Sequence, residues 1–144
     1  MNYILNIETS TSVCSASVSS GNNILALREN PADRSHAAML TGLIKEVMSE
    51  SDISFDDLSA VAVSRGPGSY TGLRIGVSTA KGICYACDIP LIAIDTLKTM
   101  AIKVIRSQYN ELDDLKDIDQ DNRLNSIPEK NITVLLSRSY RTSL

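Results

Sequence analysis

The N-terminal part of the chain alternates between hydrophobic and small polar positions, which is typical of strands. Residues 3–8 form a short apolar segment, and residues 13–19 alternate with a period of two. Residues 24–29 resume the pattern after the turn residues 20–23, where Gly and Asn accept tight backbone angles. This part of the chain therefore predicts three strands joined as an antiparallel meander.

The period then changes to that of a helix, for which Asp33 or Ser35 is a plausible N-cap. Its apolar stripe consists of Leu40, Leu43, Ile44, Val47 and Met48. Residues 54–57 resemble a capping box that opens one short helical turn. Beyond them the pattern predicts strands at 60–63 and 91–94, a helix at 71–87, and a third helix from Thr96.

The resulting order, β-β-β-α-β-α-β-α, predicts an α/β fold with a mixed sheet whose later strands are parallel and covered by helices. It is the order of the ribonuclease-H-like fold, which actin-like ATPases and sugar kinases contain twice in tandem. We expect one actin-like lobe at residues 1–106 and no second lobe. Residues 107–144 are predicted to be a polar linker or tail, because residues 107–131 are rich in Asp and poor in large apolar residues, with one candidate strand at 132–136.

The composition excludes several classes of function. The net charge is −3, and the chain has no Trp and one Phe, so direct binding to nucleic acid is not expected. Any contact with tRNA would then pass through a partner. No apolar run approaches the roughly 20 residues of a membrane helix, which predicts a cytoplasmic protein.

The strongest local motif is the segment Arg65–Arg74, in which a strand ends, glycines and a proline form a turn, and a helix begins. Free N–H groups at Gly66, Gly68 and Ser69 are suited to hold an anion. The Walker and Rossmann glycine spacings are both absent. A phosphate site and a purely structural turn remain equally open from this motif alone.

Glu8 ends the first predicted strand beside Thr9 and Ser10. In actin-like ATPases an acidic residue at this place helps to hold metal or activate water, and the hydroxyl-rich loop faces phosphate. A lone carboxylate at a strand end is more often solvated. His36 has no nucleophile partner at a recognisable spacing, so no hydrolase triad is predicted.

The helix at 71–87 carries a stripe of small residues, namely Gly72, Gly76, Ala80 and Cys84. Such a stripe indicates that something packs very close, either the chain's own sheet and first helix or another subunit.

Cys84 and Cys87 form a C-x-x-C without a second ligand pair, and we interpret them as small buried residues rather than a metal site.

The motifs together resemble the TsaB (YeaZ) family. They are Ile7-Glu8-Thr9-Ser10, Arg34-Ser35-His36 at a helix start, the run GPGSYTGLRIG at 66–76, and Ile89-Pro90-Leu91-Ile92. They occur in family order over about residues 1–105, and the glycine-rich run is highly specific for the family. The resemblance implies an actin-like fold and a role in making threonylcarbamoyladenosine in tRNA, where TsaB pairs with its catalytic relative TsaD alongside the ATPase TsaE.

The resemblance also implies a scaffold without catalytic residues, cofactor or metal. TsaD-type enzymes carry two metal-binding histidines at positions that correspond here to Thr96 and Met100. The implied interface with TsaD, or with a second copy in a homodimer, consists of Leu40, Leu43, Ile44, Val47, Met48, Gly72, Gly76 and Ala80. We expect Gly76→Leu to abolish association and retain the fold.

The rival interpretation is an ATP-using phosphotransferase or ATPase in which Glu8, Thr9 and Ser69 contact nucleotide.

Overall fold

The computed structural model describes residues 1–30 and 36–109. The elements are β1 (Tyr3–Glu8), β2 (Cys14–Ser20), β3 (Asn23–Asn30), α1 (His36–Glu50), the 3-10 helix η1 (Phe55–Asp57), β4 (Leu58–Gly66), α2 (Tyr70–Cys87), β5 (Leu91–Asp95) and α3 (Thr96–Tyr109). The predicted element order is thus confirmed. The predicted caps at Asp33 and Ser35, the predicted strand at 132–136 and all of the predicted 107–144 tail beyond residue 109 lie outside the described residues.

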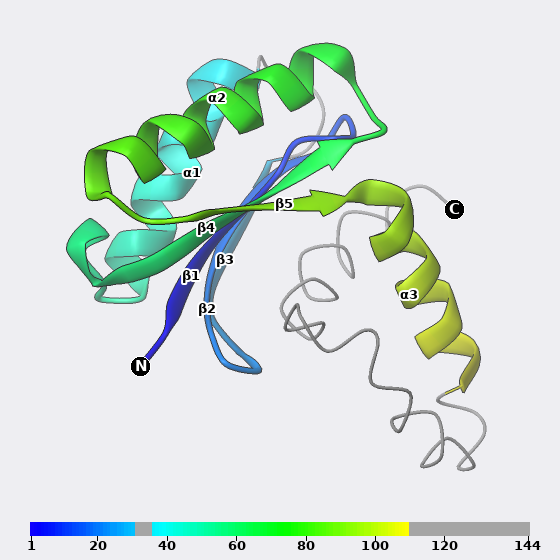
Figure 1. Cartoon of the computed structure of the whole chain (residues 1–144), viewed down its shortest axis with the longest axis horizontal. Helices are drawn as coiled ribbons and strands as arrows, with labels where there is room; N and C mark the ends of the chain where they lie inside the picture. Colours follow the sequence, from blue (N-terminus) through cyan, green and yellow to red (C-terminus); the bar gives the residue numbers. More distant parts are fainter. Residues whose placement is uncertain (31–35, 110–144) are drawn as a thin grey trace.

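The strands form one five-stranded sheet in the order β3-β2-β1-β4-β5 (Figure 1). β1 pairs antiparallel with β2, which in turn pairs antiparallel with β3. β4 pairs parallel with both β1 and β5. The mixed sheet is therefore the predicted one, and the carboxyl ends of β1, β4 and β5 share one edge.

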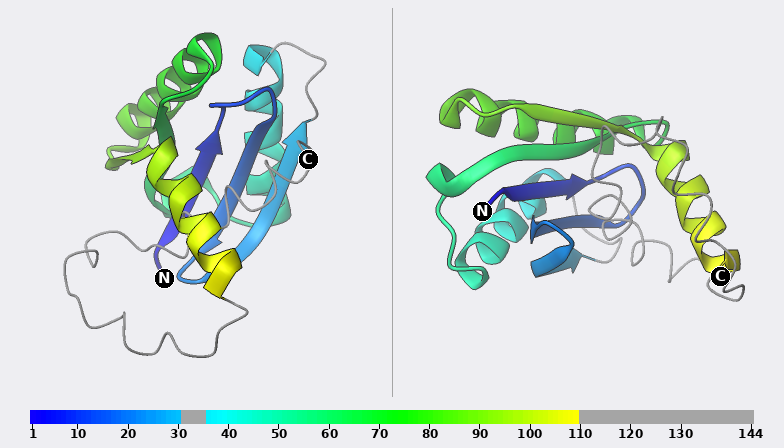
Figure 2. Two further views of the ribbon diagram at one scale, coloured as in Figure 1. Left: turned by 90° about the vertical axis from the view of Figure 1, so that its right-hand side faces the viewer. Right: turned by 60° about the horizontal axis from the view of Figure 1, so that its bottom comes forward.

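Helices α1 and α2 lie side by side on one face of the sheet (Figures 1 and 2). α1 packs on β2 and β3, and α2 packs on β4. The core between these layers contains Leu5 and Ile7 of β1, Val61 of β4, and Leu40 and Val47 of α1. Alternation along the strands directs these side chains to one face, because successive residues of a strand point to opposite sides.

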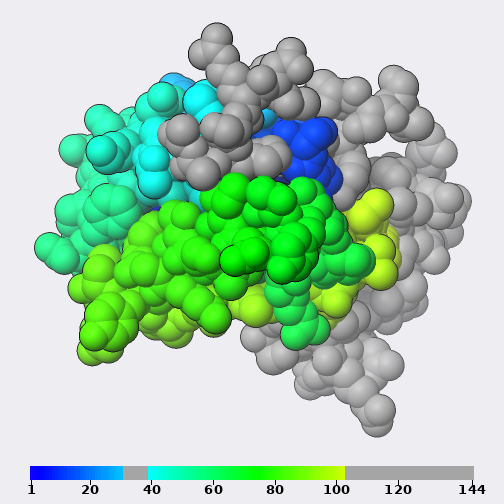
Figure 3. Space-filling view, turned by 90° about the horizontal axis from the view of Figure 1, so that it is seen from above, coloured from blue at the N-terminus to red at the C-terminus, as the bar shows by residue number. Residues whose placement is uncertain are grey.

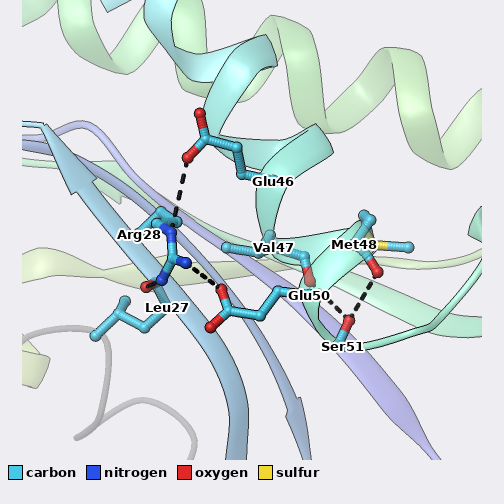
Figure 4. A network of polar contacts seen from close by, with 7 residues as sticks. All are labelled: Leu27, Arg28, Glu46, Val47, Met48, Glu50 and Ser51. Atoms are coloured by element: carbon cyan, nitrogen blue, oxygen red, sulfur yellow. Dashed lines mark hydrogen bonds and ion pairs between the residues drawn. The ribbon is translucent and has the colours of Figure 1, made fainter.

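Polar contacts tie α1 to the edge strand β3 (Figure 4). The Arg28 guanidinium lies 2.7 Å from a Glu50 oxygen and 3.7 Å from a Glu46 oxygen. All three side chains are well exposed, so these pairs contribute little, typically below about 1 kcal/mol.

Two boundaries differ from the predictions. β4 is longer than the predicted strand at 60–63, because it pairs with β1 from Leu58 to Val63 and with β5 from Val61 to Gly66. The predicted lobe boundary at residue 106 falls inside α3, which continues to Tyr109. The capping box before η1 is present, since the Ser54 N–H donates to the Asp57 carboxylate at 2.9 Å.

Candidate functional site

Glu8 lies at the carboxyl end of β1 and is completely buried, which contradicts the expectation of a solvated carboxylate. One carboxylate oxygen accepts a hydrogen bond from the Ser10 N–H at 2.7 Å. The other accepts a short hydrogen bond from the Ser64 hydroxyl on the neighbouring strand β4. This pair of donors compensates for the burial, because it replaces the hydrogen bonds that water would otherwise supply.

The loop after Glu8 is covered by helix α2. A Cβ placed on Gly72 would overlap the carbonyl oxygen of Thr9, and one on Gly76 would overlap the Thr9 hydroxyl. The small-residue stripe of α2 therefore packs against the chain's own β1–β2 loop. Of the two packing alternatives that the sequence left open, the internal one holds.

A backbone hydrogen bond connects the start of α2 to the β1–β2 loop. The Ser69 N–H donates to the carbonyl oxygen of Ser10 at 2.7 Å, and a Cβ on Gly68 would lie 2.5 Å from that oxygen. Gly66 has a φ of +115°, a conformation that L side chains rarely adopt. The glycines of this turn therefore have a structural role.

The predicted nucleotide residues are divided between interior and surface. Glu8, Thr9 and Ser10 are buried, and neither the Thr9 nor the Ser10 hydroxyl has a hydrogen-bond partner among the described residues. Gly66 is half-buried, and Gly68 and Ser69 are exposed. The Ser69 hydroxyl caps α2 by accepting from the Gly72 N–H at 3.2 Å. In this conformation the first three side chains cannot contact a nucleotide, so the expectation that they face phosphate is corrected.

The predicted partner interface is also corrected. All eight of its residues are buried within the chain: Leu40, Leu43, Ile44, Val47, Met48, Gly72, Gly76 and Ala80. The stripe of α1 packs on the sheet, and the stripe of α2 packs on the loop after β1. A helical period identifies a buried face, but it does not identify the element that buries it.

The side of α2 opposite its small-residue stripe is exposed, and the sequence analysis did not identify it as a candidate surface. This outer face of α2 consists of Tyr70, Arg74, Ser78, Lys81 and Tyr85, all exposed. Tyr70 and Tyr85 are 75% and 92% exposed. The Arg74 guanidinium lies 5.5 Å from the centre of the Tyr70 ring, which is within the range of a cation–π contact. Figure 3 shows α2, in green, running across the surface of the molecule. The spacing of these residues, on the side of the helix away from the glycines, was the signal available in the sequence.

The three cysteines are free thiols. Cys84 is buried as expected, whereas Cys87, which was also expected to be buried, is only partly so; Cys14 is buried as well. Burial, followed by the nearby Glu8 carboxylate, raises the pKa of Cys14 to about 11. Burial also raises the pKa of Cys84, whose Sγ donates to the Pro90 carbonyl at 3.5 Å. Both are therefore protonated and weakly nucleophilic near neutral pH.

Thr96 and Met100 lie on the first turns of α3. Thr96 is buried, and Met100 is 37% exposed. Within residues 1–30 and 36–109, no group of three or more His, Cys, Asp and Glu side chains is arranged to hold a metal ion. In that same part of the chain, no helix is long and apolar enough to cross a membrane.

Comparison with known proteins gives consistent relatives. A family model described as TsaD, tRNA N6-adenosine threonylcarbamoyltransferase, matches residues 29–112. The chain is 35% identical over 112 residues to the tRNA threonylcarbamoyladenosine biosynthesis protein TsaB of Buchnera aphidicola from Acyrthosiphon pisum, covering 78% of this chain and 50% of that protein. It is 36% identical over 98 residues to the protein of the same name from Escherichia coli K12, covering 68% of this chain and 42% of the relative.

The solved structures agree with the sequence relatives. YeaZ from Pseudomonas aeruginosa matches with a TM-score of 0.69 and 28% identity, over 75% of this chain and 50% of that one. The chain therefore spans about half the length of the relatives that it matches.

Proposed function

The chain belongs to the TsaB (YeaZ) family, and from this we propose that it is a non-catalytic partner of a TsaD-type threonylcarbamoyltransferase in the modification of tRNA. The family membership supports the pathway, and the tRNA substrate suggests a cytoplasmic site of action. The observation that carries the partner role is the exposed outer face of α2, with a tyrosine near each end. Exposed tyrosines and arginines are enriched at protein interfaces and among the residues that dominate binding energy.

The absence of catalysis by this chain is the second part of the proposal. The supporting observation is the enclosure of Glu8 by Ser10 and Ser64, at the strand end where actin-like ATPases use an acidic residue. By the family resemblance, Thr96 and Met100 correspond to the metal-binding histidines of the transferase, and neither replaces imidazole as a metal ligand. We expect the isolated chain to hydrolyse no ATP and to take up no stoichiometric zinc or iron, measured by phosphate release and elemental analysis.

The partner role is tested by mixing the full chain with a TsaD-type enzyme and measuring the molar mass of the complex by light scattering. The chain alone should exceed its monomer mass of 15.6 kDa by self-association through the same face, and TsaD should replace the second copy. Tyr85→Ser should weaken the complex by about tenfold or more, as the loss of an aromatic contact that dominates binding does.

A matched control is Leu97→Ser, because Leu97 is an exposed apolar residue on α3 rather than on α2. It should leave the complex unchanged. If no complex forms, or if Tyr85→Ser and Leu97→Ser weaken it equally, the outer face of α2 is not the docking surface. Thermal unfolding of each variant separates a lost contact from a lost fold.

A further inference from the structure

A second candidate site lies at the carboxyl ends of β4 and β5, away from the outer face of α2. It is a cavity of about 170 Å³ lined by Arg65, Ala93, Ile94, Asp95, Lys98, Thr99 and Ile102, here called the Arg65 pocket. Crevices at the carboxyl ends of adjacent parallel strands are common places for ligands. The predicted roles of the chain make no use of this pocket.

The charges of the pocket leave one positive charge in excess, since it has two cationic residues and one carboxylate. The Arg65 guanidinium lies 3.8 Å from an Asp95 oxygen, and both side chains are substantially exposed, so the pair is weak. The other Asp95 oxygen is occupied, because it accepts from the N–H groups of Leu97 and Lys98 at 3.0 and 3.1 Å. Asp95 is thereby held as the cap of α3. Among the described residues no ion pair involves Lys98.

The walls of the pocket are apolar where Ala93, Ile94 and Ile102 lie. Its volume equals that of about five or six water molecules in the liquid. A guanidinium matches the two oxygens of a carboxylate, and Asp95 would repel a second negative charge on a ligand. The combination suits a single negative charge on a short hydrocarbon chain.

We propose that the Arg65 pocket binds a carboxylate carried on a short apolar chain. The carboxylate contacts Arg65 and Lys98, and the hydrocarbon contacts Ala93, Ile94 and Ile102. Two sources offer this chemistry, namely a free small carboxylic acid and the glutamate side chain of a partner protein. The proposal is independent of the docking role of α2.

The test is a titration of the isotopically labelled chain with sodium butyrate, followed through the amide signals of Leu97 and Lys98. Saturable shifts are expected with butyrate, about tenfold weaker binding with acetate because two methylene groups are missing, and no saturation with butanol or sodium chloride. Shifts that fail to saturate with butyrate, or that match those of sodium chloride, would overturn the proposal.

Variants make the test specific. Arg65→Gln and Lys98→Gln should each weaken butyrate binding by about tenfold, whereas Lys45→Gln, an exposed lysine on α1, should not change it. Asp95→Asn should strengthen binding several-fold, because Asn removes the repelling charge and still caps a helix. A gain of affinity cannot come from misfolding. If Asp95→Asn binds no tighter, or Arg65→Gln binds as well as the unaltered chain, the pocket does not recognise a carboxylate.

The source of the carboxylate is decided by a second probe, N-acetylglutamate methylamide, whose only carboxylate is on the side chain. Tighter binding of this probe than of butyrate supports a glutamate from a partner protein. Tighter binding of butyrate supports a free carboxylic acid. Failure of both probes to bind overturns the proposal while leaving the docking role of α2 to its own test.

Discussion

The carboxyl ends of β1 and β5 lie at the same edge of the sheet, but one is closed and the other open (Figures 1 and 2). Glu8 at the end of β1 is enclosed, with Ser10 and Ser64 as its donors. Asp95 at the end of β5 is partly exposed, and its neighbours form a cavity. Both ends offer a carboxylate next to a helix start, so the residue types do not account for the difference.

The difference comes from the helix that packs at each strand end, which is α2 for β1 and α3 for β5. α2 carries Gly72 and Gly76 on its inner face, so its backbone approaches the loop after β1 closely enough to exclude ligand and solvent. α3 begins directly after β5, and its first turns direct Lys98, Thr99 and Ile102 toward the pocket instead of glycines. A polar cluster under a glycine-rich helix therefore contributes to stability, whereas the same chemistry under larger side chains stays accessible for binding.

The largest effect on the free energy of unfolding is expected from a substitution that forces α2 away from the loop after β1. Gly76→Leu should lower the free energy of unfolding by more than about 3 kcal/mol, because even a Cβ at this position overlaps the Thr9 hydroxyl. The structure thus reverses the expectation of lost association with a retained fold. Urea denaturation followed by circular dichroism measures the change.

Gly82 is the matched control on the same helix, since a Cβ there meets no atom within 4 Å. Gly82→Leu should raise the free energy of unfolding by up to about 1 kcal/mol, the gain in helix propensity over glycine. A Gly76→Leu protein as stable as Gly82→Leu would show that the inner face of α2 is not closely packed.

A smaller effect is expected from removing the enclosed carboxylate. Glu8→Ala leaves the Ser10 N–H and the Ser64 hydroxyl without their acceptor and should cost about 2 kcal/mol. Glu8→Gln should recover most of this, because its amide accepts one hydrogen bond and donates the other. Equal losses for Ala and Gln in the same denaturation experiment would mean that the charge, rather than the hydrogen bonding, is required.

The sequence predicted the fold well because each element left a local pattern. The alternation in residues 13–19 predicted β2, and the turn-to-helix motif at Arg65–Arg74 predicted where α2 begins. The stripe at Leu40, Leu43 and Val47 was correctly assigned to a helix and wrongly assigned to a partner. Periodicity reports that a face is apolar, and the choice between self-packing and partner-packing depends on contacts between distant segments.

The candidate site was harder to predict for the same reason. Glu8 was expected to be solvated because its hydroxyl donor, Ser64, lies 56 residues away and belongs to a neighbouring strand. The Arg65 pocket unites residues of β4, β5 and α3 that share no motif. The outer face of α2, by contrast, left a signal in one continuous segment, in the spacing of Tyr70, Arg74 and Tyr85.

A substitution at the start of α2 should have a moderate effect on the free energy of unfolding, because it removes only one hydrogen bond. Ser69→Ala removes the hydroxyl that accepts from the Gly72 N–H, and it should cost about 1 kcal/mol. The backbone bond from Ser69 to the Ser10 carbonyl is retained. Ser69→Asp should restore the cap. If Ser69→Ala unfolds at the same urea concentration as the unaltered chain, the cap does not contribute to closing this end of the sheet.

The smallest effect is expected at the open end, where Arg65→Gln should change the free energy of unfolding by less than about 0.5 kcal/mol. The reason is that its pair with Asp95 spans 3.8 Å between two exposed groups, and such pairs contribute little. The helix cap is unaffected, because Leu97 and Lys98 donate to the other Asp95 oxygen. The same urea experiment tests this, with Glu8→Ala as the reference for a closed carboxylate. A loss for Arg65→Gln as large as that for Glu8→Ala would show that both strand ends serve stability, and the contrast between them would fail. A negligible loss, combined with weaker butyrate binding by the same variant, would separate the two strand ends into one that stabilises and one that binds.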